Sequence, residues 1–280
     1  MANPTRDTTA GRVYNDLRNL ARRNRGSTDE VMVEYILERF LYRLASSPLG
    51  GKHFVLKGGL LLAQFGARRM TRDIDILGRS FPGDETEIIR RIAAIAATEI
   101  DDGVVFDPTT LKTVPIREED EYHGLRLSMA ASIARARLKL QLDVSFGDPV
   151  IPGPRIIDYP QQLTTDSFQI LGYPLATVIA EKLSTAVSLG DLDGQELTTA
   201  LTATAAHRGI TLKPLSATLT DLGERRQTSY SAWRRRQGPA ATSYPERFTD
   251  VVRQVTAFAD TLLNDEALTL TWSAATLTWS

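Results

Sequence analysis

Apolar positions near the N-terminus recur at helical spacing. Between residues 8 and 48, apolar side chains recur three and four positions apart, as Tyr35 and Ile36 do from Met32, the spacing of one face of an α-helix. Residues 46–51, Ser-Ser-Pro-Leu-Gly-Gly, are typical of a helix stop. The pattern predicts a two-helix N-terminal layer.

The middle of the chain alternates apolar runs with short connections. The run HFVL is typical of a strand ending at Gly58-Gly59, LLLAQFGA then predicts a helix, and RDIDILG predicts a second strand. DETEIIRRIAAIAATEI predicts an amphipathic helix with acidic residues in its first turn. Further strands are predicted in GVVFDP, TTLKTVPI, YHGLRLSMAAS and ARLKLQLDVSFGDP.

The C-terminal part follows a helical pattern from about residue 160. Helices are predicted in PLATVIAEKLSTAVSLG, in QELTTALTATAAHRG and twice within residues 214–264. The proline-rich PVIPGPRIIDYP favours a boundary near Gly153-Pro154. We therefore expect an α+β domain over residues 1–153 and a mainly helical domain over 154–280. The near-repeat LTWS at the end predicts a small hairpin or a disordered tail, with Trp272 and Trp279 in packing.

Composition narrows the kinds of chemistry that are available. The 280 residues are 42% hydrophobic, enough for a full core, and 33 Lys and Arg against 34 Asp and Glu exclude a generally basic surface. The absence of cysteine excludes disulfides, thiolate zinc sites and cysteine nucleophiles. Three histidines lie far apart, so we expect oxygen ligands for any metal. No apolar run has the length of a signal peptide or membrane span, so we expect a cytoplasmic protein that does not enter a membrane.

Two aspartates lie one residue apart in the apolar run RDIDILG. Strand alternation puts Thr71, Asp73 and Asp75 on one face. Paired carboxylates repel each other, so cations must accompany them. Magnesium is the natural partner, because it takes one or two carboxylates and leaves its other positions to water and phosphate.

A glycine turn and a third acid extend this site. Without side chains, Gly58 and Gly59 would let a phosphate chain approach the backbone. In RLKLQLDVSFGD, Asp143 falls on the polar side of an alternating strand. A third acid would permit a second magnesium ion, which activates an attacking hydroxyl.

These motifs together resemble a known enzyme family. FVLKGGLLL, RMTRDIDIL, LDVSFGDP and LATVIAEKLSTAVSLG are similar to the AbiEii nucleotidyltransferase toxins, including the mycobacterial branch that modifies transfer RNA. That family lies within the DNA polymerase beta nucleotidyltransferase superfamily, and the resemblance covers residues from about 30 to 220. It implies a polymerase-beta-like mixed sheet with flanking helices. It also implies transfer of a nucleoside monophosphate from a nucleoside triphosphate (NTP) to RNA, and a cognate antitoxin.

The resemblance also implies roles for particular residues. The metal ligands would be Asp73, Asp75 and Asp143, and Lys182 of the Glu-Lys-Leu helix would reach the phosphates. The nucleotide site would be formed by Lys57, Gly58, Gly59, Thr71, Arg72 and Lys182. In the resembling toxins a hydroxyl at the place of Thr71 can be modified by a partner protein, so Thr71 is also a regulatory candidate.

One departure from the family pattern leaves alternatives open. After the Glu-Lys-Leu helix the family usually has an Arg-x-Lys/Arg-Asp-aromatic-x-Asp segment, whereas here SLGDLDGQEL leads directly into TTALTATAAHRG. Asp191 and Asp193 are only weak substitutes for its aspartate. Besides an RNA nucleotidyltransferase, the alternatives are a catalytically weakened module that binds an antitoxin or RNA, and an enzyme that modifies a protein hydroxyl.

A cluster of arginines lies in the C-terminal part. Its members are Arg225, Arg226, Arg234, Arg235 and Arg236. The cluster is either a solvated helix face or a cationic platform for RNA phosphates. Beside an RNA-modifying relative, we expect the second.

Overall fold

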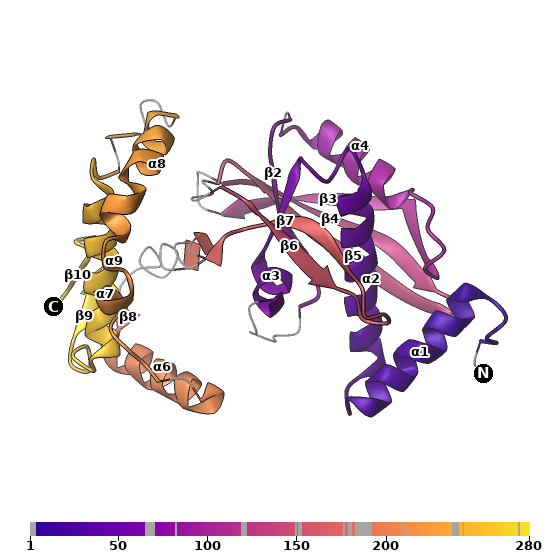
Figure 1. Ribbon diagram of the computed structural model, residues 1–280, viewed down its shortest axis with the longest axis horizontal. Coiled ribbons are helices and arrows are strands. Elements are labelled where there is room, and N and C mark those ends of the chain that lie inside the picture. Colours follow the sequence, from indigo (N-terminus) through magenta and orange to yellow (C-terminus); the bar gives the residue numbers. More distant parts are fainter. Residues whose placement is uncertain are drawn as a thin grey trace. The chain divides into compact units, whose positions relative to one another are not determined.

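The computed structural model divides the chain into two compact units, Met1–Pro174 and Leu175–Ser280, which are described separately (Figure 1). It describes residues 4–64, 71–81, 83–118, 122–148, 150, 153–175, 177–178, 181–182, 192–209, 211–236, 241–242, 244–273 and 275–280. For residues 117, 118, 122, 123, 204, 207, 208, 233 and 236 it describes the backbone alone.

The first unit begins with the predicted helical layer. Helix α1 spans Thr9–Arg23, and its N-cap Thr8 accepts a hydrogen bond from the Gly11 amide. Helix α2 spans Thr28–Ser46, and its core-facing side chains include Ile36, Phe40 and Leu44, all fully buried. The prediction of two N-terminal helices is confirmed.

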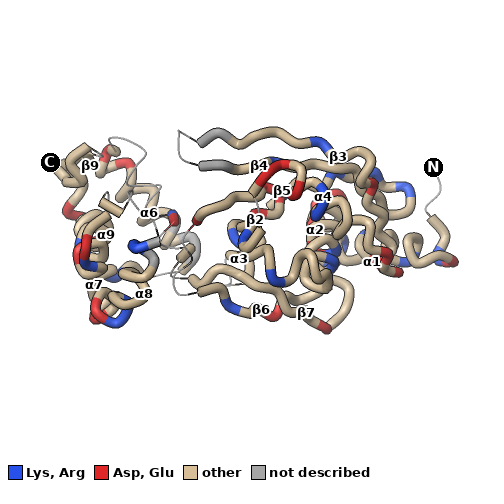
Figure 2. Tube along the Cα trace, turned by 90° about the horizontal axis from the view of Figure 1, so that it is seen from above, with Lys and Arg blue, Asp and Glu red and all other residues tan. Residues whose placement is uncertain are grey.

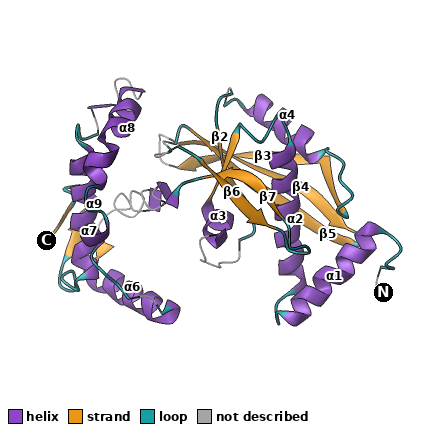
Figure 3. Ribbon diagram, viewed as in Figure 1, coloured by secondary structure: helices purple, strands orange, loops and turns teal. Residues whose placement is uncertain are grey.

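The body of the first unit is a seven-stranded mixed sheet in the order β3-β4-β5-β2-β1-β7-β6 (Figure 3). Its strands are β1 (Phe54–Lys57), β2 (Ile74–Gly78), β3 (Val104–Glu118), β4 (Tyr122–Ile133), β5 (Ala136–Phe146), β6 (Arg155–Pro160) and β7 (Ser167–Gly172). Strand β2 runs parallel to β5, and β1 parallel to β7, whereas the other pairs are antiparallel. Helices α3 (Gly58–Gln64) and α4 (Glu85–Ala96) complete the unit, so the expected α+β class is confirmed.

Strand β5 shows how the sheet separates core from surface. Leu140, Leu142 and Val144 are fully buried, whereas the alternate positions are not. Helix α2 packs on β5 and β7, and α4 packs on β3. The sheet therefore has one apolar face under helices and one polar face.

Three expectations for this region were wrong. GVVFDP and TTLKTVPI form one long strand, β3, whose register shifts between Asp107 and Lys112. Residues from about 160 are not all helical, because β7 follows β6 as its antiparallel partner. The boundary lies after Pro174 and not near Gly153, because β7 also pairs with β1 and so joins the first sheet.

The second unit combines helices with a small sheet. Its elements are β8 (Leu192–Asp193), α6 (Gly194–Arg208), α7 (Leu215–Thr218), α8 (Leu222–Arg236), α9 (Phe248–Leu263), β9 (Thr271–Ser273) and β10 (Thr278–Trp279). The two LTWS segments pair Trp272 with Trp279 in an antiparallel hairpin, so the hairpin alternative is confirmed. Trp272 is 1% exposed and packs against Phe258. Most of the helix predicted over residues 174–190 lies outside the described residues.

No helix in the part of the chain that the structure describes is long and apolar enough to cross a membrane.

Candidate active site

A row of charged residues crosses the polar face of the first sheet. Lys57 of β1 pairs with Asp75 of β2, Asp75 pairs with Asp143 of β5, and Asp143 pairs with Arg126 of β4. Directly paired residues project from the same face of a sheet. Four neighbouring strands therefore present two carboxylates between two cations. Figure 2 marks the acidic residues of the described chain in red and its basic residues in blue.

Asp75 has two carboxylate neighbours, Asp73 and Asp143. Burial raises the pKa of the Asp75 carboxyl, and the carboxylates of Asp73 and Asp143 raise it further. Lys57 and a hydrogen bond donated by the Gly59 amide act in the opposite direction. The net pKa shift is upward because burial and the two neighbouring carboxylates outweigh Lys57 and the Gly59 hydrogen bond.

Asp143 is held by an arginine that the sequence did not indicate. Arg126 Nε donates to Asp143 Oδ1 at 2.8 Å, and Arg126 Nη2 donates to Oδ2 at 2.6 Å. The Arg126 side chain is 47% exposed and that of Asp143 16%. Such a two-pronged pair occupies both carboxylate oxygens. Arg126 could have been found only by pairing β4 with β5 in the correct register.

The glycine turn is packed against Asp75. Gly58 adopts φ +65°, a left-handed conformation that favours glycine. A Cβ atom at Gly58 would lie 1.8 Å from Asp75 Oδ2, and one at Gly59 would lie 3.1 Å from Thr71 Oγ1. These glycines thus make room for the carboxylate and the threonine of the site itself, a reason that the sequence analysis missed.

Thr71 and Asp73 reach the site from the segment before β2. The strand begins at Ile74, so the prediction that both residues belong to it was wrong, and alternation applies to Asp75 alone. Thr71 Oγ1 instead donates to Asp73 Oδ1 at 2.7 Å. This hydrogen bond orients the Asp73 carboxylate.

Asp148 is a fourth carboxylate that sequence reasoning missed. Its Oδ2 accepts hydrogen bonds from Lys57 Nζ at 2.8 Å, Ser145 Oγ at 2.9 Å and Tyr173 Oη at 3.1 Å. Its side chain is 9% exposed, and that of Lys57 13%. Lys57 is therefore fixed by an ion pair at the edge of the site. The sequence offered one sign of this role, which is that Asp148 lies just beyond the end of the central strand β5.

Two further residues of the predicted nucleotide site are exposed to solvent. Arg72 is exposed just before β2, and Lys182 is exposed within the second unit.

On α8, Arg225 and Arg235 are exposed, and Arg226 and Arg234 are half-buried. Arg234 Nε donates to the Tyr244 carbonyl at 3.3 Å, and the Arg236 side chain lies outside the described part. Asp193 caps α6 by accepting from the Glu196 amide at 2.8 Å, and Asp191 also lies outside that part.

The carboxylates fit a hard divalent cation in charge and in donor type. Asp73 and Asp75 offer oxygen ligands, and the pKa of Asp75 is raised first by burial and then by the neighbouring carboxylates, whose charge a cation would offset. Within the described ranges, no three acidic or histidine side chains stand together as a ready metal site. Asp143, the third predicted ligand, is paired with Arg126.

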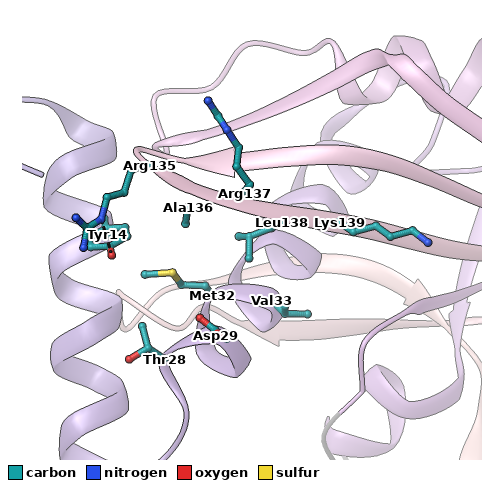
Figure 4. A pocket seen from close by; sticks show the side chains of 10 residues that line it. All are labelled: Tyr14, Thr28, Asp29, Met32, Val33, Arg135, Ala136, Arg137, Leu138 and Lys139. Atoms are coloured by element: carbon teal, nitrogen blue, oxygen red, sulfur yellow. Dashed lines mark hydrogen bonds between the residues drawn. The ribbon is translucent and has the colours of Figure 1, made fainter. Parts of the chain in front are cut away.

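A separate cavity of about 740 Å³ lies between α1, α2 and the start of β5. Figure 4 shows Met32 of α2 and Leu138 of β5 lining it, together with Arg137 and Lys139 of β5. Arg135 at its rim donates to the Tyr14 hydroxyl at 3.1 Å. The cavity lies against the apolar side of β5 and is distinct from the charged row.

Comparison with known proteins gives one match in sequence and two in structure. The family model described as "Nucleotidyl transferase AbiEii toxin, Type IV TA system" matches residues 39–195. No curated protein matches the chain. Two crystal structures from Helicobacter pylori are similar over 56% of this chain, each with 17% identity and a TM-score of 0.37. One is JHP933, of which the match spans 57%, and the other is described as a "putative nucleotidyltransferase", of which it spans 59%.

Proposed function

Because the chain belongs to the AbiEii nucleotidyl transferase toxin family, we propose that it transfers a nucleoside monophosphate from an NTP to the 3′ end of transfer RNA. Blocking that end would stop translation. The enzyme would then act in the cytoplasm, and a cognate antitoxin would regulate it. The observation that carries the proposal is the cross-strand row in which Asp75 and Asp143 lie side by side.

In the proposed reaction, the NTP and the 3′ hydroxyl of the RNA meet at this row. The acceptor hydroxyl oxygen forms a bond to the α-phosphorus, the bond to the β-phosphate oxygen breaks, and pyrophosphate leaves. The proton of the hydroxyl passes to a carboxylate of the row. The protein contributes chiefly by positioning the substrates and by arranging charge around them.

The residues of the row and those around it would have separate tasks. Asp73 and Asp75 would hold Mg²⁺, and Asp143 would join them once its carboxylate leaves Arg126. When bound, Mg²⁺ would offset the charge of the triphosphate and make the acceptor hydroxyl easier to deprotonate. Lys57, Arg72 and the Gly58-Gly59 turn would bind the phosphates, together with Lys182 as the family resemblance implies.

Asp75→Asn tests the proposed role of the carboxylates. The change removes a charge and keeps the shape, so we expect transfer to fall by at least about 100-fold. The melting temperature should stay the same or rise, since repulsion with Asp73 and Asp143 is relieved. The measurement uses labelled NTP, Mg²⁺ and total RNA, followed by separation of the RNA on a gel.

The matched control for this variant is Asp158→Asn, which changes an exposed aspartate of β6 in the same way. It should label RNA as the unchanged protein does. Full transfer by Asp75→Asn would contradict the mechanism. A label found on protein and not on RNA would instead favour a protein-modifying enzyme.

A second candidate function is that of a binding module without turnover. It is favoured by the pairing of both Asp143 oxygens with Arg126 and by the missing family segment after Gly190. Wild-type protein that binds RNA or antitoxin but adds no label to any acceptor would support this alternative.

A further inference from the structure

We propose that the polar face of β3, β4 and β5 binds the phosphate backbone of the single-stranded 3′ end of the acceptor RNA. The inference rests on the proposed function and identifies the surface that it uses. We call this surface the acceptor face, and it consists of Lys112 on β3, Arg126 on β4, and Arg137 and Lys139 on β5.

The direction of the charged row sets the place of the acceptor. The glycine turn and Lys57, where the triphosphate is proposed to bind, stand at the β1 end of the row. The opposite end of the row opens onto β5, β4 and then β3, in that order. An acceptor that meets the α-phosphate from the side opposite to pyrophosphate must therefore lie over these three strands.

The cations of β5 continue the line of Asp143 along one strand. Lys139 and Arg137 lie four and six residues before Asp143, so alternation puts all three on the same face. At about 3.4 Å per residue, they lie about 14 and 20 Å from Asp143. Both residues are exposed, and they also line the cavity beside α1 and α2 (Figure 4). A strand of RNA ending at Asp143 would place successive phosphates along this line.

Lys112 widens the same face toward the edge of the sheet. It pairs with Ser128 of β4, which in turn pairs with Gln141 of β5. Gln141 lies between Asp143 and Lys139 on the polar side of the strand. Lys112 thus lies two strands away from the β5 line, at about 10 Å.

The cations of the acceptor face other than Arg126 are available to a ligand. Lys112, Arg137 and Lys139 are exposed, and no carboxylate among the described residues lies within ion-pair distance of them. By contrast, Arg90 and Arg91 share Glu87, and Arg253 pairs with Asp250. Asp107 of β3 lies on the same side of the sheet, because it pairs with Ala130 of β4, which pairs with Lys139, and its carboxylate accepts a hydrogen bond from the Thr109 amide at 3.1 Å.

The acceptor face also exposes apolar surface. Val105 and Val114 of β3 are 65% and 59% exposed. Their partners are Ser132 and Arg126, so both valines project from the polar side. Large exposed apolar side chains beside cations suit a ligand with charged phosphates and flat bases.

The first test measures binding of a short 3′ single-stranded RNA to the full chain at several salt concentrations. Lys139→Gln/Arg137→Gln should weaken binding at least about tenfold at low salt. Two lost phosphate contacts should also lower the slope of log affinity against log salt by about 1.4, at about 0.7 per contact. NTP affinity and melting temperature should not change. Lys139→Glu/Arg137→Glu should weaken binding further.

The matched control is Lys52→Gln, an exposed lysine before β1 in the same unit. It should leave RNA affinity and the salt slope unchanged. Arg225→Gln/Arg235→Gln tests the α8 cluster as the competing surface. A loss confined to the α8 variant, or an equal loss in Lys52→Gln, would reject the acceptor face.

The outcomes separate this inference from the proposed function. Wild-type protein that labels RNA, together with an unchanged RNA affinity and salt slope in Lys139→Gln/Arg137→Gln, would reject the acceptor face alone. Wild-type protein that neither binds nor labels RNA would reject the proposed function and the acceptor face with it.

Discussion

Lys57 lies between two carboxylates, and its position shows how single residues determine the charge of the site. It pairs across the sheet with Asp75 and forms its ion pair with Asp148, 91 residues away in the chain. Alternation within one strand was enough to predict the polar faces of Asp75 and Asp143. Asp148 follows Gly147, which has φ +87°, so no strand periodicity reaches it. Partners such as Arg126 and Asp148 depend on strand pairing, which a local pattern does not contain.

Thr71 is the residue at which a modification would act most directly. Its hydroxyl already donates to Asp73, so a phosphate there would bring up to two negative charges beside the carboxylates. Thr71→Glu should therefore abolish transfer and weaken NTP binding. Thr71→Ser keeps the hydroxyl and should retain transfer. Rates and NTP affinities of the two folded variants provide the test.

Thr71→Val separates the charge from the hydrogen bond. Valine keeps the branched shape but cannot hold Asp73, at a cost of about 1 kcal/mol. We expect a modest loss of activity, far smaller than that of Thr71→Glu. Undiminished transfer by Thr71→Glu would exclude this position as a charge switch.

At the scale of elements, the sequence shows the hydrophobic periodicity within each helix or strand, but it does not show which strands pair with each other. The helices at the N-terminus and the two-faced strand β5 were predicted because their signal lies within one element. Strand β3 was split in the prediction because its bulge near Asp107 interrupts the alternation. Strands β6 and β7 were assigned to the wrong domain, since the β7–β1 pairing is made with a strand more than 100 residues earlier in the chain.

Helix α2 carries a buried acid that should make folding depend on pH. Glu38 is 2% exposed, its Oε2 accepts from the Gln162 amide at 2.7 Å, and its Oε1 lies 3.0 Å from Arg39 Nη2. Burial raises the pKa of Glu38 from 4.5 to about 7, although Arg39 and the Gln162 amide lower it and Asp102 raises it. Tyr35 and Tyr159 also face this group.

The sign of the effect follows from the upward pKa shift. The folded protein binds this proton more tightly than the unfolded chain, so the stabilisation is complete below about pH 4.5 and is lost as pH rises through 7. The loss is on the order of 3 kcal/mol. Glu38→Gln cannot ionise, so its free energy of unfolding should fall less between pH 5 and 8. Chemical denaturation at both pH values measures this, with the exposed Glu99→Gln as control. Equal pH dependence in wild type and Glu38→Gln would contradict the assignment.

At the scale of the whole molecule, the sequence predicts a sheet-rich unit followed by a mainly helical one but misplaces the division. Proline and glycine near residue 153 suggested a linker, yet the chain returns to the first sheet before leaving it at Pro174. The second unit has its own core, in which Trp272 packs with Phe258 and Leu262. Composition marks turns, whereas a domain boundary is set by which strands share a sheet.

Lys182 tests whether the second unit takes part in nucleotide binding. The family resemblance assigns this lysine to the phosphates, and its side chain is exposed and therefore accessible to a ligand. An ammonium in contact with a triphosphate contributes about 1.5–3 kcal/mol, since hydrogen bonds to charged groups are the stronger class. Lys182→Ala should thus raise the dissociation constant for NTP by at least about tenfold without changing the melting temperature. Lys213→Ala, an exposed lysine of the same unit, should leave NTP binding unchanged. Equal NTP affinity in both variants would remove Lys182 from the site and leave phosphate binding to residues of the first unit.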